Sequence, residues 1–276
     1  RTARGIGGAP LMLESLFKSI YFWFKGWHYD LGKAICQPLE PALPSSIGPH
    51  CPRLIDGFFT TFELVGLALI AAFLLARVLS QVLALGPQFL ARSIRAYVYI
   101  FQGTPILIQL WLIYYGLAQF EWIRESAAWL FLGSGWWVGL ITLTLNSAAY
   151  QTNILTGAVN NLPRGQFEGA QSIGLTQKQA YRQVLFPQAL RASWPSLANE
   201  GILLLKASAL VSTITVLDLM GHARTVFSRS YDLWVYGSAA ILYIVLTALM
   251  TLIAFLIRRY WFQSLPTDPW FKGISR

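Results

Sequence analysis

Besides Arg77, which lies near the end of the first one, four charged residues lie within long apolar stretches of this chain, a setting in which charged side chains are rare. They are Glu63, Glu200, Lys206 and Asp218. A charge at the centre of a bilayer costs about 2.5–3.5 kcal/mol on insertion scales, which indicates a role in binding or in helix contacts. Glu63 lies near the start of its stretch, where it can meet a substrate's ammonium or guanidinium group or extend to the interface. The other three are predicted to hold helices together.

Uncharged polar residues interrupt a later apolar stretch. Asn146, Tyr150 and Asn153 share one face if this stretch is helical, because residues three and four apart lie side by side. Such side chains either join helices through hydrogen bonds or line a path for a solute. Both interpretations stay open at this point.

Catalytic and metal-dependent chemistry finds no support in the sequence. Ser, His and Asp form no recognisable triad pattern. The three histidines, His28, His50 and His222, have no carboxylate or cysteine at ligand spacing, so we expect no metal and no other cofactor. The G-x-x-x-x-G-K-[ST] pattern that cradles ATP phosphates is also missing from the sequence. Any ATP-driven process must therefore draw on a partner that binds ATP and Mg.

The composition places these residues in a membrane protein. The chain has 276 residues, of which 55% are hydrophobic and 12% are charged, whereas soluble domains carry about 25% charged residues. A helix of about 20 apolar residues crosses a bilayer. Five stretches meet or approach this length: Phe58–Ser80, Thr104–Phe120, Trp136–Ala158, Leu197–Leu219 and Val235–Ile257. The sequence therefore predicts an all-α membrane protein with five transmembrane helices.

Positive charge is divided unevenly between the connections of these helices. If the end of the first stretch is cytoplasmic, that side collects 11 Lys and Arg residues and the opposite side 3, the bias typical of cytoplasmic loops. The 11 are Arg77, Arg92, Arg95, Arg164, Lys178, Arg182, Arg191, Arg258, Arg259, Lys272 and Arg276; the 3 are Arg124, Arg224 and Arg229. We therefore expect a cytoplasmic C-terminus. The net charge of +9 follows from this distribution, so we expect no nucleic-acid partner.

The N-terminal part forms a separate unit in this prediction. Apolar residues between positions 11 and 27 repeat at helical spacing, which predicts an amphipathic helix in the outer interface, with a sixth span as the alternative. A proline-rich loop follows and holds the chain's two cysteines, Cys36 and Cys51. On the oxidising side of the membrane they either form a disulfide or remain as two thiols.

The polar stretch after the third apolar segment contains the start and stop residues of two short helices. Pro163 suits the first helical turn, and Gly174 suits the C-terminal stop. Thr176 is a candidate N-cap, with Gln179 three residues later as its capping-box partner. The second short helix is expected to end at Pro187. Two short amphipathic helices that project from a membrane are suited to docking into a groove of another protein.

The same stretch carries a resemblance to a known family. Residues 168–174, Glu-Gly-Ala-Gln-Ser-Ile-Gly, are followed after nine residues by Val-Leu-Phe-Pro at 184–187. This pattern resembles the EAA loop of importer-type ABC permeases. It departs at Gly169, Val184 and Phe186, where the family carries Ala, Ile and Leu, and all three exchanges are small or apolar. We call residues 160–190 the coupling loop.

Further motifs narrow the resemblance to permeases for polar amino acids. Residues 99–105, Tyr-Ile-Phe-Gln-Gly-Thr-Pro, look like the family's F-R-G-T-P segment. Residues 143–150, Leu-Thr-Leu-Asn-Ser-Ala-Ala-Tyr, are similar to its L-N-x-A-A-Y pattern. Asn153 stands where the family commonly carries Glu, and Glu63 would then supply the negative charge for a cationic substrate. The resemblance covers roughly residues 56–262.

This resemblance implies a permease domain at 56–262, with an N-terminal extension at 1–55 and a cytoplasmic tail at 263–276. It implies residence in a bacterial inner membrane, a second permease subunit, identical or homologous, and two ATPase subunits that hydrolyse ATP. An extracytoplasmic solute-binding protein would deliver a polar amino acid. The chain itself is then not an enzyme. Which amino acid is carried, and whether the permease pair is identical, stay open.

The resemblance also assigns residues to roles. Those expected to contact the ATPase are Arg164, Glu168, Gly169, Ala170, Gly174, Arg182 and Pro187. For the arginines, a solvated or lipid-headgroup face is the alternative. Those expected along the substrate path are Glu63, Gln102, Thr104, Gln109, Asn146, Tyr150 and Asn153.

Two other classes of protein fit parts of this pattern. An ion-coupled secondary transporter would need buried acids or histidines to carry protons, and the apolar stretches offer Glu63 and Glu200 for that role. A membrane anchor for an enzyme complex would not need an ordered coupling loop.

Overall fold

The computed structural model describes residues 26–38, 40–43 and 47–262, and these are helical or turn segments with no strand among them. Residues 26–36 form a helix, and the remaining elements follow in chain order. They are η1 (Glu40–Ala42), η2 (Gly48–His50), α2 (Cys51–Leu85), α3 (Gln88–Gly103), α4 (Ile106–Trp111), η3 (Leu112–Gly116), η4 (Leu117–Gln119), α5 (Glu121–Arg124), α6 (Trp129–Leu132), α7 (Gly135–Asn160), α8 (Arg164–Ser172), α9 (Gln177–Ala180), η5 (Tyr181–Leu185), α10 (Phe186–Ser208), η6 (Ala209–Ile214), α11 (Leu219–Ser230) and α12 (Trp234–Phe262). The predicted amphipathic helix at 11–27 lies almost entirely outside the described residues.

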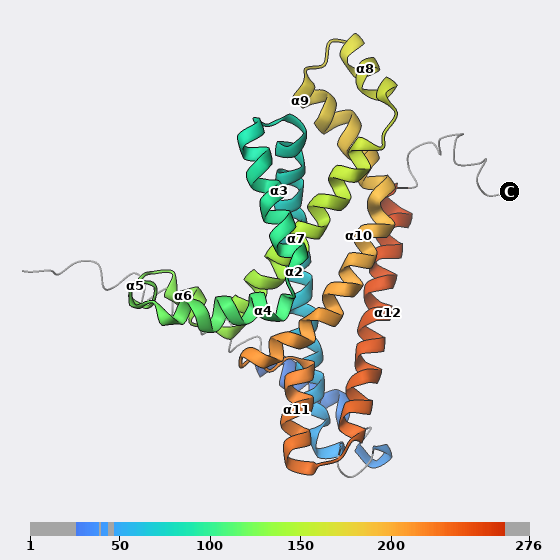
Figure 1. Cartoon of the computed structure of the whole chain (residues 1–276). Helices are drawn as coiled ribbons and strands as arrows, with labels where there is room; N and C mark the ends of the chain where they lie inside the picture. The colour runs from blue at the N-terminus through green and yellow to red at the C-terminus, as the bar shows by residue number, and fades with distance from the viewer. Residues whose placement is uncertain (1–25, 39, 44–46, 263–276) are drawn as a thin grey trace, which may run out of the picture.

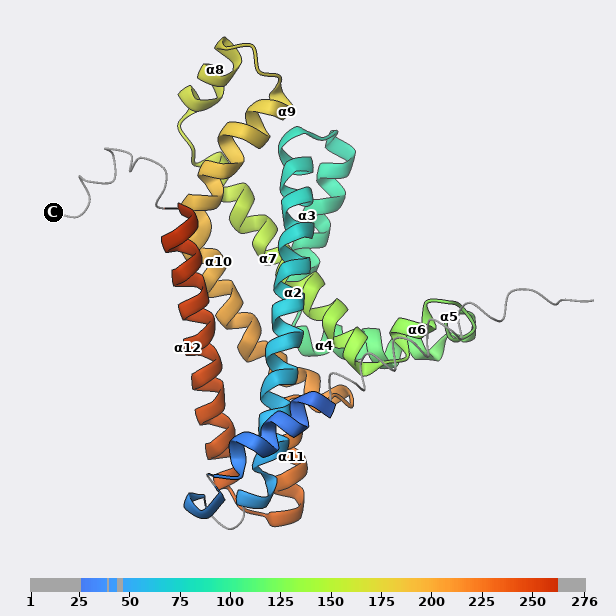
Figure 2. The ribbon, with the colours of Figure 1, turned by 180° about the vertical axis from the view of Figure 1, so that it is seen from behind.

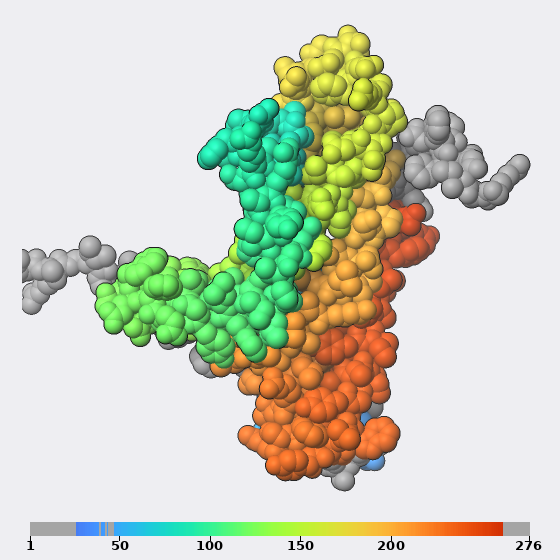
Figure 3. Space-filling model, viewed as in Figure 1, coloured from blue at the N-terminus to red at the C-terminus, as the bar shows by residue number. Residues whose placement is uncertain are grey.

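The long helices form an elongated bundle (Figure 1). The coupling loop, with α8 and α9, lies at one end together with the last residues of α12. The α11 helix lies at the opposite end, and α2 and α12 run between the two ends. The segment from α4 to α6 leaves the bundle as a lateral arm, which also protrudes in the space-filling view (Figure 3).

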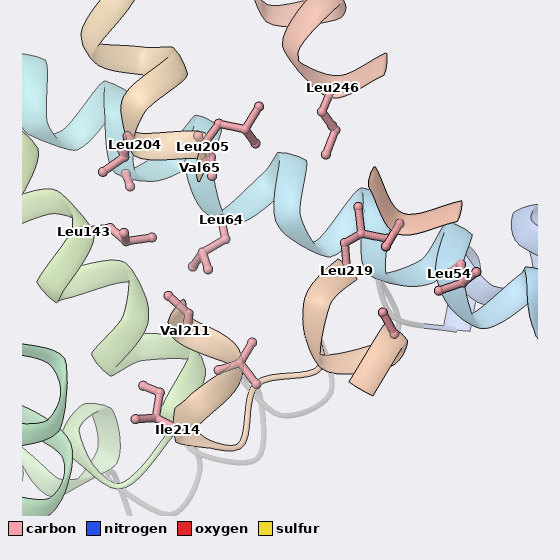
Figure 4. Close-up of a cluster of buried hydrophobic side chains, with 14 of the residues drawn as sticks. Leu54, Leu64, Val65, Leu143, Leu204, Leu205, Val211, Ile214, Leu219 and Leu246 are labelled. Carbon is pink, nitrogen blue, oxygen red and sulfur yellow. The ribbon is translucent and has the colours of Figure 1, made fainter. Parts of the chain in front are cut away.

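The core forms around α2. Side chains from α7, α10, η6, α11 and α12 surround it in a cluster that includes Leu64, Leu143 and Leu205 (Figure 4). Every fourth residue along one side of α2 is a fully buried alanine, at positions 68, 72 and 76. Small residues of this kind let helices approach closely where no water drives them together. The α12 helix is different, because most of its apolar surface is exposed, as suits contact with lipid.

The membrane spans only partly match the five predicted ones. Three described helices are long and apolar enough to cross a membrane, namely Gly48–Leu85, Gln177–Ile214 and Trp234–Trp261. A fourth would come from the pair Gln88–Gly103 and Ile106–Gln119, which is bent by 106°. The α7 helix has the length of a span, but its polar residues lower its hydropathy. The count of five is therefore not confirmed.

Two of the expected spans were wrong. The second was predicted over Thr104–Phe120, but the chain bends before Ile106 and then passes through short α, π and 3-10 turns. The fourth span begins about 20 residues before Leu197, and it ends at Ile214 rather than at Leu219. The predicted domain start at residue 56 falls inside α2.

The α11 end is held by buried polar contacts between distant segments. Asp218 caps α11, with Oδ1 accepting a hydrogen bond from Gly221 N at 2.8 Å. Thr61 Oγ1 of α2 accepts another from Leu219 N at 3.0 Å. His222 Nε2 lies 3.1 Å from Asp56 Oδ2, and both side chains are buried. Asp218, one of the residues predicted to hold helices together, thus caps its own helix, and that prediction stays a prediction.

The helix at 26–36 crosses α2 near this end (Figure 2). Its buried positions are every fourth residue, His28, Gly32 and Cys36. The His28 ring stacks on Phe59 with centroids 5.3 Å apart, and a Cβ on Gly32 would meet the backbone of α2 at 2.8 Å. Cys36 and Cys51 form a disulfide, with Cα atoms 5.9 Å apart.

Burial changes the titration of two groups at this end. It raises the pKa of Asp218 to about 7, and the hydrogen bond from Gly221 N opposes that rise. It lowers the pKa of His28, and the negative charge of Asp56 opposes that fall. Both shifts follow from the cost of placing a charge away from water.

Two glycines of α2 test how closely α11 is packed. A Cβ on Gly57 would lie 2.7 Å from Leu219 Cα and 2.9 Å from Asp218 O, whereas a Cβ on Gly66 would meet nothing within 4 Å. We expect Gly57→Ala to lower the free energy of unfolding by about 1–3 kcal/mol because the contact atoms are backbone. Gly66→Ala should leave it unchanged or raise it by up to about 1 kcal/mol. Thermal unfolding in detergent measures both, and equal effects would contradict this packing.

Candidate functional site

The bend between α3 and α4 leaves backbone groups that need new partners. Pro105 has no N–H, and the residue before a proline is disfavoured in helical conformation. Thr104 is accordingly extended, with φ −112° and ψ 140°. Gln109, one turn into α4, compensates: its Nε2 donates to Phe101 O at 2.9 Å and to Thr104 Oγ1 at 2.7 Å.

Asn146 of α7 completes this network. Its Nδ2 donates to Gln109 Oε1 at 3.1 Å and to Phe101 O at 3.2 Å. Nearby, Gln102 Nε2 donates to Ala149 O at 3.3 Å, so a second amide side chain joins α3 to α7. The polar residues that the sequence analysis singled out thus fix the bend against the neighbouring helix.

A cavity of about 460 Å³ opens beside this network. Its lining comes from α3, α4, α7 and α10: Gln102, Gly103, Thr104, Pro105, Ile106, Asn146, Tyr150, Glu200, Leu203, Leu204 and Ala207. We call it the polar cavity. A neighbouring cavity of about 420 Å³ shares Tyr150, Glu200 and Leu203 with it. In the space-filling view the surfaces of α3 and α10 lie on either side of α7 (Figure 3). Volumes in this range are typical of small-molecule sites.

Glu200 supplies the acidic group of the polar cavity. Only 6% of its surface is exposed, and its Oε1 accepts a hydrogen bond from Ser147 Oγ at 3.0 Å. Ser147 in turn accepts one from Gln151 Nε2 at 3.0 Å. No ion pair involves Glu200 among the described residues. The carboxylate is therefore positioned by α7, and it can accept further hydrogen bonds from a cationic group in the cavity.

The structure places some of the residues predicted along the substrate path at the polar cavity and others away from it. Gln102, Thr104, Asn146 and Tyr150 line the polar cavity, and Gln109 lies behind its wall. Glu63 is half-buried on α2 and Asn153 is exposed on α7, and neither lines either of the two cavities.

The sequence analysis placed Glu200 with the structural residues and did not see its position in the cavity. A signal was present, because the cavity residues of this helix repeat at helical spacing. They are Pro195, Ser196, Asn199, Glu200, Leu203, Leu204 and Ala207. Lys206, predicted to join helices, is exposed, and no ion pair involves it in the described part of the chain.

The coupling loop has the predicted local structure in its first part. The α8 helix begins after Pro163, and Gly174 has a φ of 86°, which side chains with a Cβ rarely adopt. Thr176 and Gln179 form the predicted capping box. Gln166 of α8 and Gln188 of α10 are hydrogen-bonded at 3.1 Å, so the loop folds back on its own stem.

The expected stop at Pro187 was wrong. Residues Gln177–Ile214 form one continuous helix. Pro187 lies in this run directly after an irregular turn, at the start of α10. The π turn η5 precedes it and shifts the hydrogen-bond pattern by one residue.

Six of the seven residues expected to contact an ATPase are exposed on this loop. They are Arg164, Glu168, Gly169, Gly174, Arg182 and Pro187, whereas Ala170 of α8 is buried. The exposed residues form a surface of backbone and small side chains at the far end of the bundle, and charged side chains flank this surface.

Comparison with known proteins decides the family. Residues 65–264 match the family described as "Binding-protein-dependent transport system inner membrane component". The chain belongs to this family. It is 39% identical over 201 residues to the arginine ABC transporter permease protein ArtM of Haemophilus influenzae, covering 72% of this chain and 88% of that protein. It is 38% identical over 211 residues to ArtM of Escherichia coli, covering 76% and 95%.

Further relatives and solved structures agree with the family. The octopine transport system permease protein OccM of Rhizobium radiobacter is 39% identical over 153 residues, covering 55% of this chain and 62% of that protein. An amino acid ABC transporter crystallised with histidines superposes with a TM-score of 0.68 at 31% identity, covering 78% of this chain and 96% of that one. An inward-facing MetNI methionine transporter gives 0.63 at 21% identity, covering 75% and 95%, and it supports the fold alone. This chain is thus the permease of an amino-acid ABC transporter.

The network at the bend yields a test with a matched control on the same helix. Asn146→Leu removes a donor from Gln109 Oε1, which would be left buried without that partner. We expect the free energy of unfolding to fall by about 1–3 kcal/mol. Asn153→Leu, at an exposed position of α7, should change it little. Melting temperatures in detergent report the difference, and a stable Asn146→Leu variant would speak against the network.

Proposed function

We propose that this chain is the membrane-spanning subunit of an ATP-driven importer that carries polar amino acids across a bacterial inner membrane. The observation that carries the proposal is the polar cavity, in which one buried carboxylate and several amide and hydroxyl groups converge, and which shares a continuous helix with a coupling loop of the importer type. The five-span topology, the cytoplasmic position of the coupling loop and the cytoplasmic C-terminus belong to this proposal.

The polar cavity has the chemistry of an amino-acid site. Glu200 would accept hydrogen bonds from an ammonium or guanidinium group, while Gln102, Thr104 and Asn146 offer neutral polar groups. A carboxylate held in place by Ser147 binds a cation at less cost than a mobile one, because its orientation is already fixed. The naming of the ArtM relatives for arginine supports a substrate with a basic side chain.

The coupling loop would transmit work from partner subunits. Two ATPase subunits would bind ATP and Mg and contact the exposed surface around Glu168, Gly169 and Gly174. Arg164 and Arg182 flank this surface and would pair with acidic residues of the ATPase. A solute-binding protein on the outer side would deliver the substrate, and a second permease subunit would complete the path. The chain would hydrolyse no ATP itself.

An ion-coupled secondary transporter is the rival function. It would use Glu200 as a proton carrier and would not need a coupling loop. Membership of a binding-protein-dependent family favours the ATP-driven mechanism.

Arginine uptake by the complex tests the role of Glu200. The permease, its ATPase and its binding protein are reconstituted in proteoliposomes and supplied with ATP. Glu200→Gln should lower uptake by about 10- to 100-fold, the range expected when a charge-assisted hydrogen bond is lost. Glu63→Gln is the matched control, because Glu63 lines neither cavity, and its uptake should stay near that of the unmodified complex. Equal uptake by both variants would remove Glu200 from the substrate path.

The bend at Gly174 provides a test of coupling. Gly174→Pro forces φ to about −65° where the loop needs 86°. We expect ATP hydrolysis to lose its stimulation by the loaded binding protein and arginine uptake to fall at least tenfold, with normal membrane insertion. Gly165→Ala, in α8 with no atom within 4 Å of the added Cβ, should behave like the unmodified protein. Normal transport by Gly174→Pro with the ATPase bound would rule out this loop as the coupling element.

A further inference from the structure

The coupling loop joins its membrane helix through an irregular turn. Residues Tyr181–Leu185 form the π turn η5 between α9 and α10, within the continuous helix Gln177–Ile214. Turns of this kind occur mostly as single insertions in α-helices and are frequent at functional sites. The π turn lies where any movement of α8 and α9 would enter the bundle.

The first residue of this turn is anchored to a second helix. Tyr181 is 2% exposed, and its hydroxyl lies 3.2 Å from Ser80 Oγ of α2. Ser80 Oγ also donates to Arg77 O at 3.1 Å. A serine hydroxyl has a single proton, so Tyr181 is the donor in the contact between the two side chains.

Apolar and cation–π contacts surround this hydrogen bond. The guanidinium carbon of Arg77 lies 5.3 Å from the ring centroid of Phe186, the residue that follows the π turn. Ala76, Leu155, Tyr181, Phe186 and Leu197 form a buried cluster at the coupling-loop end, separate from the main core. A rigid contact of α2 with the π turn is therefore built from three kinds of interaction.

The anchored helix reaches the other end of the molecule. The α2 helix extends from Cys51 to Leu85. Near its start, Asp56 and Thr61 contact α11. A displacement of the π turn that carried α2 with it would thus be felt at α11 directly through α2, besides the path that runs along α10 and η6 past the polar cavity.

We propose that Ser80 and Tyr181 are positioning residues that make α2 move together with the coupling loop. The proposal rests on the proposed function, since it presumes that an ATPase moves the loop. It adds a second route for that movement: α10 carries it to the polar cavity, and α2 carries it to the α11 end. The two hydroxyl groups form a latch between the loop and α2.

Removal of single hydroxyl groups separates this role from folding. In Tyr181→Phe, Ser80 Oγ keeps its bond to Arg77 O, so no buried donor loses its partner. Ser80→Ala leaves the Tyr181 hydroxyl without its acceptor and is the harsher change. Tyr181→Phe is therefore the main variant, and the double variant completes a cycle.

The experiment measures arginine uptake and ATP hydrolysis in the same proteoliposomes, with the full complex and its binding protein. We expect Tyr181→Phe to keep ATP hydrolysis within about twofold of the unmodified complex while arginine transported per ATP falls about fivefold, as loss of one buried hydrogen bond allows. Ser80→Ala should lower the same ratio, and the double variant should be no worse than Ser80→Ala, because the two residues share one contact.

Matched controls lie outside the contact. Tyr260→Phe alters an exposed tyrosine of α12, and Ser93→Ala alters a serine of α3 whose hydroxyl bonds within its own helix. Both should leave the ratio unchanged. Unchanged ratios in Tyr181→Phe and Ser80→Ala would overturn the latch, as would parallel losses of uptake and hydrolysis with less assembled complex. Absence of ATP-driven uptake in the unmodified complex would instead overturn the proposed function, and the latch with it.

Discussion

Hydrogen bonding inside an apolar bundle is the constraint on which the rest of the structure depends. The chain bends sharply between α3 and α4, and backbone groups freed within a membrane-embedded bundle need partners inside the protein. Gln109 and Asn146 take over that task, and their side chains bring α3, α4 and α7 into a fixed relation. The bend turns the chain away from the bundle, which leaves room for a cavity between α3 and α10. The cavity is therefore a result of how the bend is satisfied.

The cavity and the coupling loop share one continuous helix. Glu200 lies in the same helical run as Tyr181, after the π turn and after Pro187 and Pro195. A rotation of the π turn would consequently reach the carboxylate along this one helix. Trp194, which donates from Nε1 to Ala254 O at 3.0 Å, ties this run to α12 between those positions. The helices α2 and α12 thus both contact the run that connects the coupling loop to the polar cavity through α10.

Local signals predicted much of this arrangement. The capping box at Thr176, the positive φ of Gly174 and the start of α8 after Pro163 depend on neighbouring residues, and the sequence alone was sufficient for them. The grouping of Asn146 and Tyr150 followed from helical spacing. Contacts between residues far apart in the sequence could not be predicted from such local signals. Glu200 and Ser147 are 53 residues apart, and nothing in either segment states that they meet. The continuation of the helix through Pro187 depends on a π turn, which has no strong sequence signal.

The helix at 26–36 has a practical consequence for any shortened form of the protein. The family match begins at residue 65, which makes the preceding part look dispensable. Yet His28 and Gly32 pack directly on α2, and the disulfide fastens this helix to the first residue of α2. Trimming the chain to its matched region would remove the first turns of α2 together with Asp56 and leave His222 facing solvent or lipid. A recombinant fragment that begins at the family boundary would therefore expose the packing surface at the α11 end of the bundle.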